Sequence, residues 1–138
     1  MIILDTNILS ELVKPAPHQQ VIDWLDSLVP DEVATTAVTA AELWHGVRRL
    51  PDGKRRAELA EGIDAMLFDD LGGRIEAFDT AAASRYADIV TAREKAGRPI
   101  ATADAQIAAI CAKRGAVLAT RNVKDFEGVG ITLVNPWA

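Results

Sequence analysis

Short apolar runs alternate along the chain with longer stretches in which apolar residues recur at helical spacing. Five of the runs have the length and composition of buried strands, at 2–4, 32–36, 74–78, 116–119 and 131–134. The amphipathic stretches between them predict helices at 7–13, 18–29, 39–50, 54–69, 79–96 and 102–114. Strands that alternate with helices are typical of an α/β domain. We therefore expect a five-stranded, mostly parallel sheet flanked by helices.

Several predicted helices begin at residues that favour a helix N-terminus. Asp79 and Thr102 are suitable N-caps for the last two helices. Thr39 opens the third helix, and Thr39-x-x-Glu42 matches a capping box, in which the glutamate accepts a hydrogen bond from the cap amide. The spacing therefore predicts three helix starts and gives Glu42 one local structural interpretation.

The length and composition are those of one globular domain over residues 1–138. Apolar residues make up 49% of the chain and charged residues 25%, which is compatible with a core that needs no disulfides. No apolar run reaches the ~20 residues of a membrane span, and the N-terminus lacks the basic segment of a signal peptide. The single cysteine, Cys111, excludes a disulfide framework and a CxxC site. We expect a cytoplasmic protein with no membrane partner.

The charge balance restricts how the chain can handle nucleic acid. Fifteen Lys and Arg against twenty Asp and Glu give a formal net charge of −5. Binding to duplexes without regard to sequence depends on a basic surface, which this composition does not supply overall. Any nucleic-acid function therefore needs a local source of positive charge, such as a metal ion, a basic patch or a basic partner chain.

Four polar residues are candidates for one site. Asp5 ends the first predicted strand and Asn122 follows the fourth, while Glu42 and Asp104 lie in the first turns of helices that begin near the same edge. Ligands of an open parallel sheet bind at the carboxyl ends of its strands, near the point where the strand order reverses. A set of oxygen ligands suits Mg²⁺ or Mn²⁺ rather than zinc. The pattern therefore indicates a divalent-cation site.

Each of these residues also has a purely structural interpretation. Asp5 would cap the helix that follows it, Glu42 would complete the capping box, and Asp104 would complement its helix dipole. Asn122 and Asp125, taken alone, are typical turn residues. The residues by themselves leave both interpretations open.

Taken together, four stretches resemble the signature blocks of PIN-domain proteins, and more narrowly of the VapC/FitB-type toxins of bacterial type II toxin–antitoxin systems. The stretches are Ile3-Leu4-Asp5-Thr6-Asn7-Ile8-Leu9-Ser10, Thr39-x-Ala41-Glu42-Leu43-x-x-Gly46, Ala103-Asp104-x-x-Ile107-Ala108-Ala109 and Ala119-Thr120-Arg121-Asn122-x-x-Asp125-Phe126. The resemblance runs the whole length of the chain, in the same order and spacing. It implies a PIN-like fold and a Mg²⁺- or Mn²⁺-dependent endoribonuclease. It also implies a homodimer, or a larger assembly with a cognate antitoxin. In such an assembly only the antitoxin would bind operator DNA.

Asp5, Glu42 and Asp104 match the three acidic residues of the family's site. The fourth acidic position falls on Asn122, which departs from the aspartate of many relatives, and Asp125 follows three residues later. We expect Asn122 to orient groups without carrying charge, and Asp125 to help hold the metal or a water.

Three further residues of the resembling stretches are predicted to act at the site. Thr6 and Asn7 belong to the first motif and are expected to orient Asp5 or a bound water. Arg121, beside the fourth acidic position, is the candidate phosphate ligand.

Two other classes of protein also place an aspartate after the first strand. A haloacid-dehalogenase-like phosphatase needs a second aspartate two residues later, where this chain has Asn7. A non-catalytic α/β binding module such as a phospho-receiver domain needs adjacent acids near the first strand, where Asp5 stands alone. Cleavage of RNA, against hydrolysis of a small phosphomonoester, separates these alternatives.

Overall fold

The computed structural model describes all residues from Met1 to Ala138, and its centre is a five-stranded sheet. Every neighbouring pair is parallel, in the order β3-β2-β1-β4-β5, so the predicted α/β architecture is confirmed. The strands are β1 (Ile2–Leu4), β2 (Val33–Thr36), β3 (Ile75–Glu76), β4 (Val117–Ala119) and β5 (Leu133–Val134).

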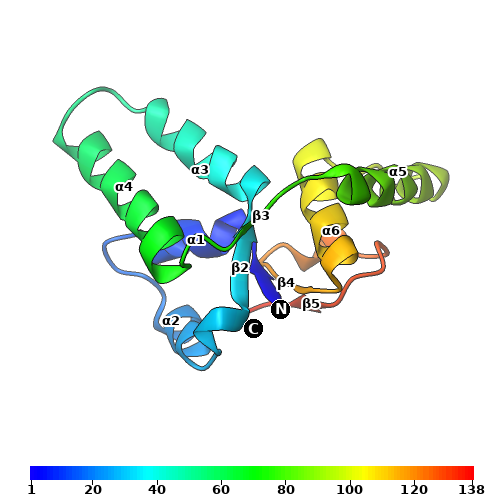
Figure 1. Cartoon of the computed structure of the whole chain (residues 1–138), viewed down its shortest axis with the longest axis horizontal. Helices are drawn as coiled ribbons and strands as arrows, with labels where there is room; N and C mark the ends of the chain where they lie inside the picture. Colours follow the sequence, from blue (N-terminus) through cyan, green and yellow to red (C-terminus); the bar gives the residue numbers. More distant parts are fainter.

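Six α-helices cover the two faces of this sheet (Figure 1). They are α1 (Thr6–Leu12), α2 (Gln19–Asp26), α3 (Ala37–Arg48), α4 (Lys54–Ala65), α5 (Thr80–Lys95) and α6 (Thr102–Arg114). Consecutive residues of β1 point to opposite faces, as the pleat of a strand requires. Leu4 packs with apolar residues of α1 to α4, whereas Ile3 packs with those of α5 and α6. The core is therefore divided into two layers by the sheet.

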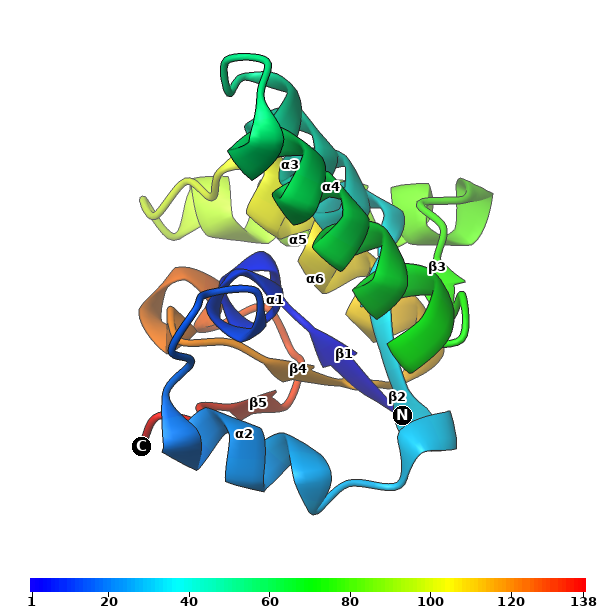
Figure 2. The same cartoon turned by 90° about the vertical axis from the view of Figure 1, so that its left-hand side faces the viewer.

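The α3 and α4 helices form a hairpin that extends away from the sheet, and α2 lies at the opposite end of the molecule (Figures 1 and 2). The α1 helix lies between them in Figure 2, directly after β1. No helix combines the length and the apolar character that crossing a membrane requires.

The strand order reverses beside β1. The chain passes from β1 outward to β2 and β3 on one side, and then places β4 and β5 on the other. The backbone N–H of Asp5 still donates to Ala119 O at 2.9 Å, so the pairing of β1 with β4 extends to the ends of both strands. Residues that follow these two strands therefore leave the sheet side by side, where a ligand site is expected.

Two of the predicted helix starts are wrong and one is confirmed. The Asp79 carboxylate caps α5 by accepting from Ala82 N–H at 3.0 Å. The α3 helix begins two residues earlier than predicted, at Ala37, because the Thr36 hydroxyl at the end of β2 caps it by accepting from Thr39 N–H at 3.0 Å. Thr102 is the first residue of α6 and not its cap.

Other element boundaries also differ from the sequence prediction. The α2 helix ends at Asp26, before the predicted end of the second helix. The last turn of the predicted helix over 54–69 is a π-helix, Met66–Asp70. A 3₁₀ turn, Val123–Phe126, lies in the stretch that the sequence indicates as a turn.

Candidate active site

A polar cleft opens where β1 and β4 end, with a volume of about 410 Å³. Seven of the eight predicted site residues line it, from four separate parts of the chain, and only Asp125 is not among them. Its lining residues are Asp5, Thr6, Asn7, Ser10, Glu11, Lys14, Glu42, Asp104, Arg121, Asn122 and Trp137. The fold therefore brings the predicted cluster together, with a single apolar residue among the lining.

Asp5 is the most buried acid of the cleft, with 5% of its surface exposed. Its carboxylate accepts hydrogen bonds from Thr6 N–H and the Thr120 hydroxyl, both at 2.8 Å, and from the Asn7 amide at 3.3 Å. Burial raises the pKa of Asp5 above its ordinary value, although the three donors act in the opposite direction. The bond to Thr6 N–H also caps α1. Asp5 therefore caps a helix, as one sequence interpretation predicted, and lines the cleft as well.

Thr6 and Asn7 connect Asp5 with other parts of the site. The Thr6 hydroxyl donates to Glu42 Oε1 at 2.9 Å and is hydrogen-bonded to Thr39 Oγ1 at 3.1 Å. The Asn7 amide oxygen accepts from Arg121 N–H at 3.2 Å. Glu42 is therefore held by α1, and the capping-box interpretation of this residue is wrong because Thr36 caps the helix.

Asp104 lies in the first turn of α6, half-buried and without a hydrogen-bond donor to its carboxylate. Burial is the largest cause that raises its pKa to about 6, and the nearby charges of Asp5, Asp125 and Glu42 raise it further. The buried Arg93 acts in the opposite direction. Proximity to a helix N-terminus stabilises a carboxylate, but here it does not outweigh burial and like charge.

Asn122 and Asp125 lie on the segment that follows β4. Asn122 lines the cleft, and its backbone N–H donates to the Thr120 hydroxyl at 3.0 Å. Asp125 is exposed in the 3₁₀ turn, and its charge raises the pKa values of both Asp5 and Asp104. Asp125 therefore lies within electrostatic reach of the cluster, although it does not line the cleft.

The sequence does not single out four other contributors. Thr120 holds Asp5 from the neighbouring strand, and only the strand order places it there. Ser10, Glu11 and Lys14 follow Asn7 at intervals of three or four residues, so helical spacing alone would have put them on its face. The buried Glu11 accepts from Lys14 Nζ at 3.0 Å and from His18 N–H at 3.1 Å, which fixes the end of this face.

The chemistry of the donors fits a hard divalent cation. The acids and the neutral polar side chains of the cleft offer carboxylate, hydroxyl and amide oxygens, beside the cations Lys14 and Arg121, and the carboxylates oppose one another's ionisation. As the side chains stand, no three His, Cys, Asp or Glu residues lie close enough to hold one ion. The site is thus an open cluster of acids, and a cation would relieve the repulsion between their carboxylates.

Comparison with known proteins identifies the class of protein that this fold and cleft define. The family model described as "PIN domain" matches residues 2–131, and the chain belongs to that family. Within it the chain is of the VapC/FitB type. It is 39% identical to "Toxin FitB" of Neisseria gonorrhoeae and 37% identical to "VapC ribonuclease Y4jK" of Sinorhizobium fredii, over 99% of this chain and at least 98% of each relative.

Solved structures agree with this membership. The crystal structure of FitAcB from Neisseria gonorrhoeae superposes with a TM-score of 0.92, at 39% identity and 99% coverage of both chains. That of DNA-bound VapBC from Salmonella typhimurium has a TM-score of 0.78 at 25% identity, covering 98% of this chain and 97% of the other. The resemblance of the four sequence stretches is confirmed, and the PIN-domain interpretation prevails over the phosphatase and receiver alternatives.

We expect Asp104→Asn to stabilise the metal-free protein. The pKa of Asp104 is about 6 in the fold, above its ordinary value of 3.8, so ionisation disfavours the folded state. Stability is therefore lost as pH rises from about 3.8 to about 6. At pH 7.5 the free energy of unfolding of the variant should exceed that of wild type by about 1 kcal/mol, after allowance for solvent screening. Thermal unfolding in EDTA measures this difference.

The advantage of Asp104→Asn should shrink as the pH falls from about 6 toward 4, because the carboxyl of the folded wild-type protein is then neutral. Asp88→Asn, which removes an exposed carboxylate from α5, is the matched control and should change little. A variant that melts at or below the wild-type temperature at pH 7.5 would contradict the electrostatic account of the cluster.

Proposed function

We propose that the chain is a Mg²⁺- or Mn²⁺-dependent endoribonuclease, the toxin of a toxin–antitoxin pair. The observation that carries this proposal is the meeting of Asp5, Glu42 and Asp104, from three separate elements, at one polar cleft beside the reversal of strand order. The names of relatives support the activity. Besides the Sinorhizobium ribonuclease, "tRNA(fMet)-specific endonuclease VapC" of Shigella flexneri is 28% identical over 98% of this chain. We expect the chain to encounter both its RNA substrate and its antitoxin in the cytoplasm.

Asp5 and Asp104 are the residues proposed to hold the metal ion, with Glu42 as a direct or water-mediated ligand. A bound divalent ion supplies an activated water and neutralises charge on the phosphoryl oxygens. It also reverses the sign of a cleft that would otherwise repel a phosphodiester. A bound cation would thus let the cleft attract the negatively charged RNA although the net charge of the chain is −5.

The other residues of the cleft orient these carboxylates and the substrate. Thr6 N–H and the Thr120 hydroxyl each hold Asp5, and the Thr6 hydroxyl holds Glu42, so neither carboxylate is free to rotate away. Asn122 is proposed to orient neighbouring groups through its neutral amide, and Asp125 to help hold the ion or a water.

Arg121 is proposed to bind a phosphate of the RNA at the rim of the cleft. Its guanidinium lies over the ring of Trp137, 5.1 Å from the ring centroid, which limits the positions it can take. Its backbone N–H is bound by Asn7, so the residue is anchored to the same helix that orients Asp5.

If this proposal holds, Asp5→Asn and Asp104→Asn should each reduce RNA cleavage by about a hundredfold or more, since each removes a charged ligand of the proposed ion. Cleavage of a mixed RNA substrate in Mg²⁺ or Mn²⁺ measures this, with EDTA as the metal-free condition. Asp88→Asn should keep wild-type activity. Full activity in either site variant, or wild-type cleavage that persists in EDTA, would sink the proposal.

An apolar groove beside the cleft is the proposed docking site of the antitoxin. It has a volume of about 1170 Å³ and runs between α1, α2 and the α3–α4 hairpin, with Leu12, Leu25 and Leu59 among its lining. An apolar groove of this kind suits an amphipathic helix. The groove shares Thr6 and Glu42 with the polar cleft, so a segment that lies in it reaches the acidic site directly. A basic side chain of that segment would there meet the carboxylates.

The structures of relatives supply the precedent for a partner, because they are of FitAB and VapBC complexes, some bound to DNA. We propose that this chain reaches operator DNA only through its antitoxin, in agreement with its own net negative charge. Self-association of the chain stays a prediction.

Leu25→Ala and Leu59→Ala should each weaken binding of the cognate antitoxin by about tenfold, because each removes apolar area that the partner would cover. Titration calorimetry with that protein measures the change, and RNA cleavage should be unaffected. Phe68→Ala, which removes an exposed aromatic ring outside the groove, is the control. Wild-type affinity in both leucine variants would place the partner elsewhere.

A further inference from the structure

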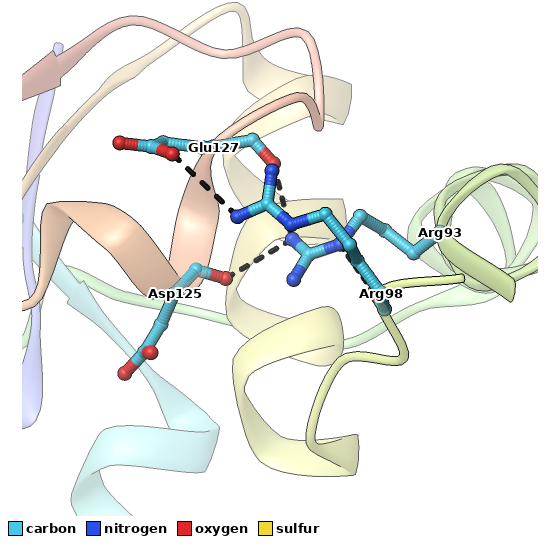
Figure 3. A network of polar contacts seen from close by, with 4 residues as sticks. All are labelled: Arg93, Arg98, Asp125 and Glu127. Carbon is cyan, nitrogen blue, oxygen red and sulfur yellow. Dashed lines mark hydrogen bonds and ion pairs between the residues drawn. The ribbon is translucent and has the colours of Figure 1, made fainter. Parts of the chain in front are cut away.

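Arg93 of α5 is a buried arginine that lies outside the cleft and has no carboxylate within ion-pairing distance. Only 7% of its surface is exposed. Its guanidinium donates to three backbone carbonyls instead: Nε to Arg98 O at 2.7 Å, and Nη1 to Asp125 O at 3.2 Å and Glu127 O at 3.1 Å (Figure 3). The side chain therefore ties together segments that are about thirty residues apart.

These carbonyls belong to the two segments that position acids of the cluster. Arg98 lies in the connection from α5 to α6, just before the helix turn that carries Asp104. Asp125 lies in the 3₁₀ turn itself, and its carboxylate points away from the arginines, opposite to the carbonyl that Arg93 holds (Figure 3). Fixing that carbonyl fixes the direction in which the Asp125 side chain leaves the backbone.

A buried cation is unfavourable unless its charge and its donors are balanced. The three carbonyls satisfy donors of Arg93, and the acidic cluster supplies opposite charge, since Arg93 favours the ionised form of Asp104 against the effect of the other acids. Arg93 therefore combines a contact that holds the turn with a charge that acts on Asp104.

We propose that Arg93 is a positioning residue of the cation site, which acts by holding in place the 3₁₀ turn that carries Asp125. The inference rests on the proposed function, because Asp125 assists a cation only if the cleft binds one. Arg98 provides a contrast within the same network. Its side chain makes only a half-exposed ion pair with Glu127 at 3.5 Å, of a kind that contributes little.

The test measures Mn²⁺ binding by calorimetry, without RNA, for Arg93→Lys, Asp125→Asn and the double variant. Lysine keeps the charge but cannot reproduce the fork that spans the carbonyls. Arg93→Lys should weaken Mn²⁺ binding by about tenfold, as loss of a group that orients a metal ligand does. In the Asp125→Asn background it should have no further effect, because both changes remove the same contribution. Arg98→Gln is the matched control and should bind Mn²⁺ like wild type.

Hydrogen exchange supplies a readout that does not involve metal. The amides of Asp125 and Glu127 donate to Asn122 O and Lys124 O, and both should exchange faster in Arg93→Lys. Arg93→Gln, which leaves no buried charge, should show the same loss of Mn²⁺ affinity and serves if the lysine variant does not fold.

The outcomes separate the two proposals. A wild-type protein that binds no Mn²⁺ overturns the proposed function, and this inference with it. Wild-type binding together with unchanged affinity in a folded Arg93 variant overturns the role of Arg93 alone. Effects of Arg93→Lys and Asp125→Asn that add fully in the double variant would also overturn it, since they would show a general structural role.

Discussion

Repulsion between carboxylates at the reversal of strand order is the interaction on which the functional part of this molecule depends. Asp5 follows the central strand β1, and Asp104 lies on α6, the helix that precedes the neighbouring strand β4. The parallel sheet therefore brings the two acids to the same edge. Both pKa values are raised, with burial as the largest cause. The hydrogen bonds to Asp5 hold one acid of this pair in place, so the repulsion is not relieved by its moving away.

Neighbouring residues act on these acids in two ways. The Thr120 hydroxyl holds Asp5 and the Thr6 hydroxyl holds Glu42, each by a short charge-assisted hydrogen bond. Arg93 approaches from α5 behind the cleft, where its charge offsets part of the repulsion. The apolar groove borders the same cleft. One end of the sheet thus combines an acidic cluster with an apolar surface.

The order of the elements and most of the cluster could be predicted from sequence, because apolar periodicity reports burial and a strand end reports the edge of a sheet. The predicted capping box failed for a local reason. Thr36, at the end of a buried strand, already satisfies the amide of Thr39, which left Glu42 to bond with Thr6. Thr120 and Arg93 were not predictable. The first depends on which strands are neighbours, and the second bonds to backbone carbonyls, which carry no residue signature.

If the acids at this edge form one cation site, diffraction from a crystal of the protein soaked in Mn²⁺ will reveal the bound ion. Anomalous scattering locates Mn²⁺ independently of any activity. The account predicts a single strong peak between the carboxylates of Asp5 and Asp104, at about 2.2 Å from an oxygen of each, as expected for a hard divalent ion. Saturating Mn²⁺ that leaves this position empty, or that binds only at other surface acids, would contradict it.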